Sequence, residues 1–226
     1  MPDALLEGRE LVKRFGKDEA LRGISIEVAR GEVVAVLGPS GSGKSTLLHC
    51  LAGIFRPDDG QVLVDGRRID DKSEAARSTL RRERFGLVFQ FGQLVPELTA
   101  LENVSLPLRL TGSGREKAEA AAHDWLGRME LQDVSRSYPG ELAGGQAQRV
   151  AVARALIGEP DVIFADEPTG SLDSMNGERV MDLLTSAARE RGAAVLMVTH
   201  DARVAAYAGR EVVLADGRLA TPVVAS

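Results

Sequence analysis

The chain has 226 residues, of which 44% are hydrophobic and 27% charged, and its formal net charge is −5. This length and composition predict a buried core in about one to two domains, and the negative charge argues against nucleic acid as the main partner. A single cysteine excludes an internal disulfide, and without a signal peptide or an apolar run near ~18 residues we expect a cytoplasmic protein.

Residues 10–30 are predicted to form two strands, near Leu11–Arg14 and Ile24–Val28. A polar turn that includes Phe15 and Gly16 joins them. An aromatic ring at this place is either a core residue at the end of a strand or a platform on which a purine base stacks. Its position alone favours the core interpretation.

A glycine-rich loop comes next, between an apolar run at residues 33–37 and helix-forming residues that extend to Gly53. It reads Gly38-Pro39-Ser40-Gly41-Ser42-Gly43-Lys44-Ser45-Thr46, which is the phosphate-loop pattern. Its glycines let backbone N–H groups converge on an anion, and the helix N-terminus adds partial positive charge. Lys44 is placed to contact the β- and γ-phosphates and Ser45 to bind Mg²⁺. The alternative, a glycine- and serine-rich surface loop, is disfavoured by the flanking strand and helix.

The segment after this loop continues the α/β pattern. Cys50 is interpreted as a packing residue because its neighbours are apolar. We expect a strand at residues 61–64, a polar helix at 73–83 and a buried strand at 86–90 that ends in Gln90. The arginine-rich stretch 77–84 is interpreted as the solvated face of that helix, with contact to an anionic partner as the less favoured alternative.

Helical patterns dominate residues 91–158. One helix begins at the capping residue Thr99, a longer one covers residues 114–130, and a third follows residues 142–146. We interpret this block as a helical subdomain inserted into an α/β core formed by residues 1–90 and 159–226. The whole chain is then one domain.

The α/β pattern returns after residue 158 with strands at 162–167 and 193–198, a helix at 176–190 and a closing hairpin at 211–219. The continuous apolar strands are typical of a parallel sheet covered by helices on both faces. The first of them ends in Asp166 and Glu167. If the sheet is parallel, both carboxylates lie beside the phosphate loop, Asp166 to hold Mg²⁺ and Glu167 to polarise the water that attacks the γ-phosphate. An acidic loop after a strand is the alternative.

A second anion-binding pattern, Leu142-Ala143-Gly144-Gly145-Gln146, begins the third helix of the inserted block. The phosphate loop already serves the chain's own nucleotide. The second pattern therefore indicates a site that another subunit completes. Together with Phe15, Gln90, residues 171–173 and His200, it resembles the ATP-binding-cassette (ABC) ATPase family, and the motif order agrees over nearly the whole chain.

The resemblance implies an α/β fold with a P-loop NTPase core of the RecA type: a mixed, mainly parallel sheet, an N-terminal antiparallel β subdomain and the inserted helices. It also implies that Phe15 stacks on adenine, that Gln90 senses Mg²⁺ and the γ-phosphate, and that His200 contacts that phosphate. Residues 143–146 would be the signature motif that contacts the nucleotide of the opposite subunit, and Asp173 a carboxylate that crosses the dimer interface. His49 and His123 match no motif and are interpreted as helix-surface residues.

The residues implied to act fall into three groups. The implied catalytic residues are Lys44, Gln90, Glu167 and His200, and the implied Mg²⁺ ligands are Ser45, Gln90 and Asp166. The implied ATP-binding residues are Phe15, Gly38, Pro39, Ser40, Gly41, Ser42, Gly43, Lys44, Ser45, Thr46, Gln90, Ala143, Gly144, Gly145, Gln146 and Asp173.

One position departs from the family pattern, which usually has serine where this chain has Ala143. A hydroxyl that donates to a charged phosphate contributes ~1.5–3 kcal/mol, which corresponds to roughly ten- to a hundred-fold in rate or dimer affinity. We expect a slower or weaker ATPase that still turns over.

The function implied is the motor subunit of a membrane transporter, a head-to-tail dimer of identical chains around ATP and Mg²⁺. Because the chain has no membrane span, a separate permease is required, contacted between Phe91 and Leu110, and the protein would lie peripherally on the inner face of the membrane. Residues 96–104 and 166–173 are most similar to the branch that exports macrolides, lipoproteins and antimicrobial peptides. The alternatives are a soluble ABC protein that acts on DNA or ribosomes and a nucleotide switch without turnover.

Overall fold

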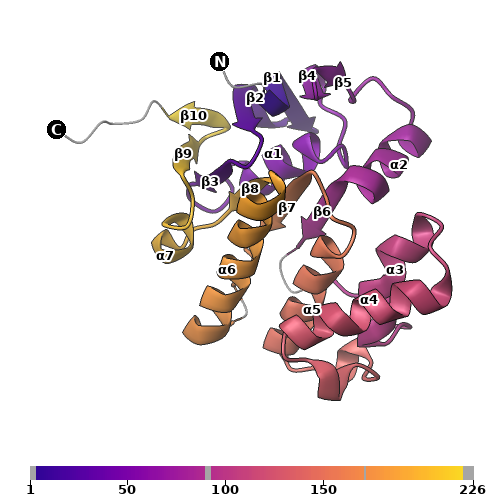
Figure 1. Cartoon of the computed structure of the whole chain (residues 1–226). Coiled ribbons are helices and arrows are strands. Elements are labelled where there is room, and N and C mark those ends of the chain that lie inside the picture. Colours follow the sequence, from indigo (N-terminus) through magenta and orange to yellow (C-terminus); the bar gives the residue numbers. More distant parts are fainter. Residues whose placement is uncertain (1–3, 90–92, 171, 221–226) are drawn as a thin grey trace.

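The computed structural model of the chain describes residues 4–89, 93–170 and 172–220 and contains two sheets (Figure 1). The first has the order β2-β1-β4-β5 with antiparallel pairing; its strands are β1 Ala4–Phe15, β2 Asp18–Ala29, β4 Asp59–Val64 and β5 Arg67–Arg68. The second has the order β10-β9-β3-β8-β7-β6; its strands are β3 Val33–Leu37, β6 Phe85–Val88, β7 Val162–Asp166, β8 Ala194–Val198, β9 Arg210–Ala215 and β10 Arg218–Ala220. Within it only the β9–β10 pair is antiparallel. The predicted mainly parallel sheet and the antiparallel N-terminal sheet are confirmed.

The helices surround the second sheet and extend beyond one end of it. They are α1 Lys44–Leu51, α2 Glu74–Arg84, α3 Ala100–Leu110, α4 Arg115–Arg128, α5 Gly144–Leu156, α6 Ser174–Arg191 and α7 Ala202–Ala205. Figure 1 shows α3, α4 and α5 gathered at the end of the molecule opposite the antiparallel sheet. In the part of the chain that the structure describes, no helix has the length and apolar character that a membrane crossing requires.

Alternating side chains of the central strands supply two hydrophobic cores. In β3, Val33 and Ala35 face the core that contains the inserted helices, whereas Val34 and Val36 face the core shared with α1 and the antiparallel sheet. The same alternation runs along β7 and β8. A parallel strand with both faces buried needs this continuous apolar sequence. The helical block therefore packs on the same core as the sheet.

The first strand is longer than the sequence predicted, because β1 begins at Ala4 instead of near Leu11. A bulge interrupts its pairing with β2 between Gly8 and Leu11, and Glu10 adopts a left-handed backbone with φ 49°. A bulge shifts the two-residue alternation of buried side chains. The sequence pattern therefore hides the continuity of this strand.

The prediction of a solvated arginine face on residues 77–84 is wrong for three of its four arginines. Arg77 is buried, Arg81 donates to a backbone carbonyl of the turn after α1 at 2.6 Å, and Arg84 forms ion pairs with two aspartates. Arg82 is exposed. Arg81 and Arg84 fasten α2 to other parts of the fold, whereas Arg77 pairs with Glu74 of its own helix.

Candidate functional site

The phosphate loop, residues 38–43, leaves the end of β3 and turns directly into α1. Gly41 and Gly43 have φ of 80° and 102°, a backbone region that favours glycine. A Cβ on Gly43 would lie 2.4 Å from the carbonyl oxygen of Ala20 in β2, and one on Gly38 would lie 2.1 Å from that of Leu214 in β9. The loop is therefore enclosed by two strands and requires glycine for its shape.

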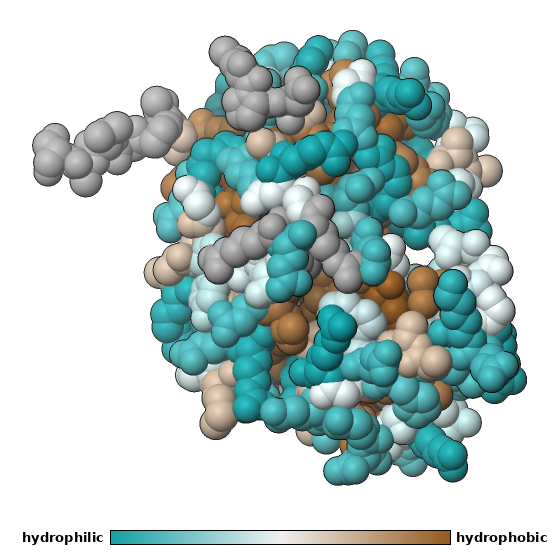
Figure 2. Space-filling model, in the orientation of Figure 1, coloured by the Kyte–Doolittle hydropathy of each residue, from teal (hydrophilic) through white to brown (hydrophobic). Residues whose placement is uncertain are grey.

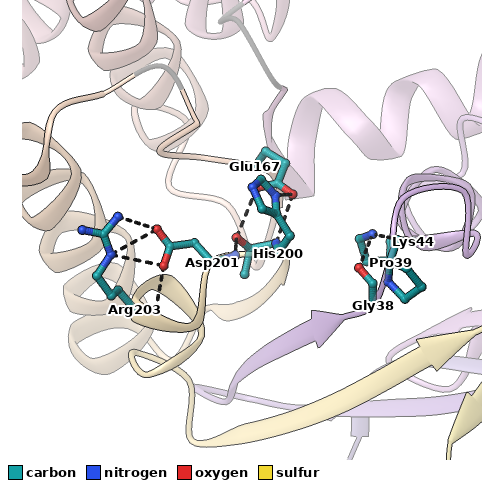
Figure 3. Close-up of polar contacts among 8 residues, drawn as sticks. Gly38, Pro39, Lys44, Glu167, His200, Asp201 and Arg203 are labelled. Carbon is teal, nitrogen blue, oxygen red and sulfur yellow. Dashed lines mark hydrogen bonds and ion pairs between the residues drawn. The ribbon is translucent and has the colours of Figure 1, made fainter.

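Lys44 lies at the mouth of this loop. Its ammonium nitrogen Nζ donates to the carbonyl oxygens of Gly38 at 2.8 Å and Pro39 at 2.9 Å (Figure 3). Gly43, the residue that precedes α1, provides no side-chain cap, so the first N–H groups of the helix face the loop without a side-chain acceptor. An ammonium group held beside open backbone donors is suited to bind phosphate.

The expected carboxylates lie at the same edge of the sheet as the loop. β3, β8 and β7 are neighbours and run parallel, so their carboxyl ends coincide. These ends lead into Gly38, Thr199 and Glu167, with Asp166 as the last residue of β7. The sequence prediction that Asp166 and Glu167 lie beside the phosphate loop is consistent with this order.

Glu167 is held by contacts from the end of β8. Its backbone has φ 47°, and its N–H donates to the carbonyl of Val198 at 2.9 Å. Its carboxylate accepts from the Thr199 hydroxyl at 3.1 Å, from the His200 backbone N–H at 3.1 Å and from the His200 Nδ1 at 2.7 Å. The carboxylate is largely buried, with 14% of the side chain exposed, so its direction is fixed by these donors.

His200 is exposed on the other side of this pair. Its hydrogen bond to the Glu167 carboxylate, and then the charge of that carboxylate, raise the pKa of His200 above its usual value. The proton on Nδ1 is therefore directed at Glu167, and the remainder of the ring faces solvent (Figure 3). Asp201, the next residue, caps α7 and pairs with Arg203 at 2.8 Å. This arrangement keeps a carboxylate and an imidazole in contact at the edge that bears Lys44.

Aromatic rings line up from the N-terminal turn towards the end of β6. Phe15 is 48% exposed and meets Phe55 edge-on with ring centroids 5.7 Å apart. The ring of His49 lies 5.2 Å from Phe55 and 5.8 Å from Phe89. Phe15 is thus not a core residue, and the Lys13 Nζ lies 5.6 Å from the centroid of its half-exposed ring.

His49 differs from its prediction as a helix-surface residue, whereas His123 on α4 is exposed as predicted. His49 is half-buried between the two phenylalanine rings, and this burial lowers its pKa despite the opposing charge of Asp166. The sequence does not reveal this, because both rings come from outside α1. Cys50 is buried as predicted, and the burial raises the pKa of its thiol to about 12.

The start of α5 is more open than the start of α1. Ala143 precedes the helix, and its backbone N–H donates to the Gln146 side-chain oxygen at 2.9 Å. An alanine cannot return a hydrogen bond to the helix, so only half of a capping box forms. Ala143 and Gly144 are exposed, and a Cβ on Gly144 would meet nothing within 4 Å. These donors face solvent.

Asp173 begins α6 and lies near the start of α5. Its carboxylate accepts from the backbone N–H of Asn176 at 3.0 Å and from the Asn176 side chain at 2.6 Å, and these bonds lower the pKa of Asp173. The preceding residue, Leu172, lies 3.3 Å from where a Cβ on Gly145 would be. The structure thus brings residues 172–173 and the predicted signature motif together.

The chemistry of the residues near the loop fits Mg²⁺. Ser45 on the first turn of α1 and Asp166 at the end of β7 offer the hard oxygen donors that this ion prefers. Among the described residues, no group of three His, Cys, Asp or Glu side chains forms a ready-made metal site. Mg²⁺ commonly needs only one or two protein carboxylates and completes its shell with substrate phosphates and water.

Two predicted contributors lie outside the described residues, Gln90 and the Ser171 that precedes Leu172. Sequence reasoning missed Thr199, which holds Glu167, and Gln148, a buried polar residue of α5. Gln148 was detectable in principle. It occupies the apolar stripe of its helix, four residues before Val152 and eight before Leu156.

Comparison with known proteins agrees with this geometry. Residues 21–170 match the pattern of the family described as ABC transporter. The chain is 46% identical over 224 residues to the lipoprotein-releasing system ATP-binding protein LolD 1 of Caulobacter vibrioides, with 97% of this chain and 96% of the relative covered. It is 44% identical over 220 residues to LolD of Geobacter metallireducens, covering 96% and 98%.

A solved structure extends the likeness to the fold. The dimeric, post-hydrolysis state of the ATP-binding cassette MJ0796, bound to ADP and Pi, superposes with a TM-score of 0.91 at 38% identity. The match covers 96% of this chain and 97% of that one. The inserted helices, both sheets and the phosphate loop thus belong to one known architecture.

Proposed function

The chain belongs to the ABC transporter family and is one of its ATP-hydrolysing subunits, and on that premise we propose that two copies close head to tail around two ATP molecules to drive a membrane permease. The observation that carries this proposal is the exposed, half-capped start of α5. It offers anion-binding donors that its own phosphate loop does not need. A second copy supplies the phosphate that these donors bind.

Within one copy, the phosphate loop binds the nucleotide. The backbone N–H groups of residues 38–46 and the Lys44 ammonium bind the β- and γ-phosphates, and Phe15 stacks on adenine. Ser45, Gln90 and Asp166 would hold Mg²⁺, which would supply positive charge to stabilise the phosphates during hydrolysis. Lys44 exchanges its two backbone carbonyl partners for phosphate oxygens.

Glu167 polarises the attacking water and His200 senses the γ-phosphate. In the structure each side chain is the other's partner, with Nδ1 2.7 Å from Oε1. His200 is 75% exposed and free to turn towards a phosphate, while Thr199 keeps Glu167 in place. Rotation of His200 leaves Oε1 of Glu167 able to accept a proton from water. The exchange links nucleotide arrival to activation of the base.

In the dimer, residues 143–146 and Asp173 of one copy face the nucleotide of the other. Gly144 and Gly145 supply backbone donors at a helix N-terminus. Asp173 and Leu172 lie beside them, so one contact surface contains both motifs. Met175, two residues after Asp173, is 66% exposed and adds an apolar contact near the same helix start.

The permease is proposed to dock in a groove between α2, β6 and α3, which overlaps the predicted contact region from Phe91 to Leu110. The groove has a volume of about 330 Å³, and Figure 2 shows hydrophobic side chains exposed in this hollow. Its apolar lining is formed by Phe85, Leu87, Phe89, Leu106, Pro107 and Leu110. Arg81, Arg82 and Arg154 outnumber Glu83 around it. The charge balance fits an amphipathic cytoplasmic segment of the permease that carries a carboxylate, which would hold the chain on the inner face of the membrane.

The cargo is proposed to be a lipoprotein or another hydrophobic compound or peptide that is exported. The LolD relatives are named as parts of lipoprotein-releasing systems, and they align over nearly their full length. A soluble ABC protein or a switch without turnover is less consistent with these relatives and with the intact Lys44, Asp166 and Glu167.

Steady-state ATP hydrolysis by the purified chain tests the catalytic part. Because a positioned general base contributes about 10²–10⁴-fold, we expect Glu167→Gln to lower Mg²⁺-dependent turnover at least a hundredfold. Glu116→Gln, an exposed change on α4, serves as the matched control and should be silent. Turnover by Glu167→Gln that equals the control would refute the assigned role.

Docking is tested in membranes that contain the proposed permease partner. Leu110 is 51% exposed in the groove, and Leu110→Glu should release the chain from membranes that contain the permease while leaving basal ATP turnover unchanged. Lys117→Glu, an exposed change on α4, is the control for added negative charge. Equal membrane retention of both variants would place the permease contact elsewhere.

A further inference from the structure

A glutamine side chain is buried where the inserted helices meet the catalytic edge of the sheet. Gln148 lies on the second turn of α5 and is 1% exposed. Its Nε2 donates to the carbonyl oxygen of Pro168 at 2.9 Å and, more weakly, to that of Phe89 at 3.4 Å. Both partners are acceptors, so the donor end of the amide faces them. Among the described residues, its Oε1 has no partner.

These two carbonyl groups belong to the segments that bear expected catalytic residues. Phe89 directly precedes Gln90, and Pro168 directly follows Glu167. Both segments leave the carboxyl ends of β6 and β7, which pair in parallel with Val88 opposite Ala165. A single side chain of the helical block therefore connects to the backbone beyond two adjacent strands.

The far end of α5 is also fixed against the sheet. A Cβ on Gly86 in β6 would lie 2.5 Å from the carbonyl oxygen of Ala155, so helix and strand are in direct backbone contact there. At the start of the same helix, Ala143 and Gly144 are exposed, and Gly145 and Gln146 are partly exposed. Gln148 is the polar connection between that exposed start and the sheet.

We propose that Gln148 is a positioning residue for ATP hydrolysis, which transmits the placement of the α5 start to Glu167 and to the backbone at Phe89. The inference rests on the proposed function, in which Glu167 polarises water and the α5 start contacts the other copy's γ-phosphate. Glu167 has a left-handed backbone, φ 47°, that neighbouring bonds must support. Its own N–H is held by Val198, and the carbonyl of the next residue is held by Gln148.

The test removes the donor and keeps the shape. Gln148→Met has similar length and volume but no N–H group. Because a misplacement of about 1 Å costs up to ~10²-fold in rate, kcat should fall about ten- to a hundred-fold. The dissociation constant for ATP should stay within about twofold, because the phosphate loop is untouched. Turnover at saturating ATP and equilibrium titration with ATP measure the two effects separately.

Thr185→Val is the matched control for loss of a buried polar contact. The Thr185 hydroxyl is buried in α6 and donates to the carbonyl of Met181 at 2.9 Å, away from Glu167. We expect this variant to lower Tm and leave kcat unchanged. If Gln148→Met does not fold, Gln148→Glu preserves the shape and turns an acceptor towards the two carbonyl groups, and it should lower kcat at least as much.

Three outcomes would count against the positioning role of Gln148. A kcat for Gln148→Met within about twofold of the parent overturns the positioning role, as does a loss of kcat that Thr185→Val reproduces at equal Tm. If the parent hydrolyses ATP and Glu167→Gln does not, either of these two outcomes overturns the role of Gln148 and leaves the proposed function standing. A parent without turnover overturns the proposed function and the inference together.

Discussion

The starts of α1 and α5, the two helix ends that we propose bind phosphate, have opposite surroundings. Each is preceded by a residue that supplies no side-chain cap, Gly43 or Ala143. At α1 the loop is enclosed, since a Cβ on Gly43 would lie 2.4 Å from a carbonyl oxygen of β2. At α5 a Cβ on Gly144 would meet nothing within 4 Å. The first site is complete within one chain, and the second is half of a site.

This difference explains how a helix N-terminus can bind ATP within one chain at α1 and close a dimer at α5. The enclosed loop can hold ATP by itself, because strands β2 and β9 fix its shape. The open helix start offers donors without walls, so its affinity for phosphate depends on a second molecule. Substitutions should therefore separate ATP binding, which belongs to α1, from dimer closure, which belongs to α5.

The largest expected effect comes from Lys44→Ala. Loss of charge-assisted hydrogen bonds to the β- and γ-phosphates, each ~1.5–3 kcal/mol, should weaken ATP binding about a hundredfold or more. Calorimetric titration of the monomer with ATP measures it. Lys117→Ala on α4 is the control, because that side chain is exposed and distant in sequence. ATP binding by Lys44→Ala close to the parent's would break the assignment of α1 as the complete site.

The same substitution at the two glycines should give unequal results. Gly43→Ala introduces the clash with β2 in a left-handed backbone, which alone costs about 1–2 kcal/mol, and should lower both Tm and ATP affinity. Gly144→Ala enters open space and should change stability by no more than ~0.5 kcal/mol, with ATP binding by the monomer intact and dimer closure weakened. Thermal melts and ATP titrations of both variants measure this. Similar losses of ATP affinity in Gly43→Ala and Gly144→Ala would contradict the assignment of ATP binding to α1 and dimer closure to α5.

Ala143→Ser should raise activity. The new hydroxyl accepts from the backbone N–H of Gln146 and completes the capping box, which adds about 0.5–1 kcal/mol to stability. It can instead donate to the facing phosphate, which predicts a gain of roughly ten- to a hundred-fold in turnover or in ATP-driven dimerisation. Unchanged turnover and dimerisation would show that position 143 makes no phosphate contact.

The smallest effect is expected from Asp173→Asn. Asparagine caps a helix as well as aspartate does, so the hydrogen bond from the Asn176 backbone should persist. The Tm should therefore stay close to that of the parent. Removal of the charge should weaken dimer closure only a few-fold, because the group is exposed and screened by solvent. Sedimentation with ATP compares it with Glu178→Gln, a change further along α6. A fall in Tm without any change in dimerisation would leave Asp173 as a cap only.

Local patterns predicted much of this molecule. The runs at 33–37, 162–166 and 194–198 are strands because both their faces are apolar, and Thr99 begins α3 with a complete capping box. The contacts that escaped prediction are non-local. His49 is half-buried by rings from outside its helix, and Arg84 of α2 binds aspartates far away in the sequence. Gln148 reaches carbonyls beyond two other strands. Side-chain type and spacing do not encode such partners.

Cross-linking between copies tests whether the α5 start of one copy closes the phosphate loop of another. In the Glu167→Gln background, one protein carries Ser40→Cys in the phosphate loop and another carries Ala143→Cys at the α5 start, both at exposed positions. The native Cys50 is buried and its thiol pKa is raised to about 12, so it does not compete for the reagent.

With a short thiol-to-thiol reagent, we expect a cross-linked pair only when the two proteins are mixed and ATP is present. Neither protein alone should cross-link, because equal positions lie in different halves of a head-to-tail dimer. A mixture that stays uncross-linked with ATP, or a pair formed equally well by Ser40→Cys alone, would contradict the claim that the open helix start of one copy closes the phosphate loop of the other.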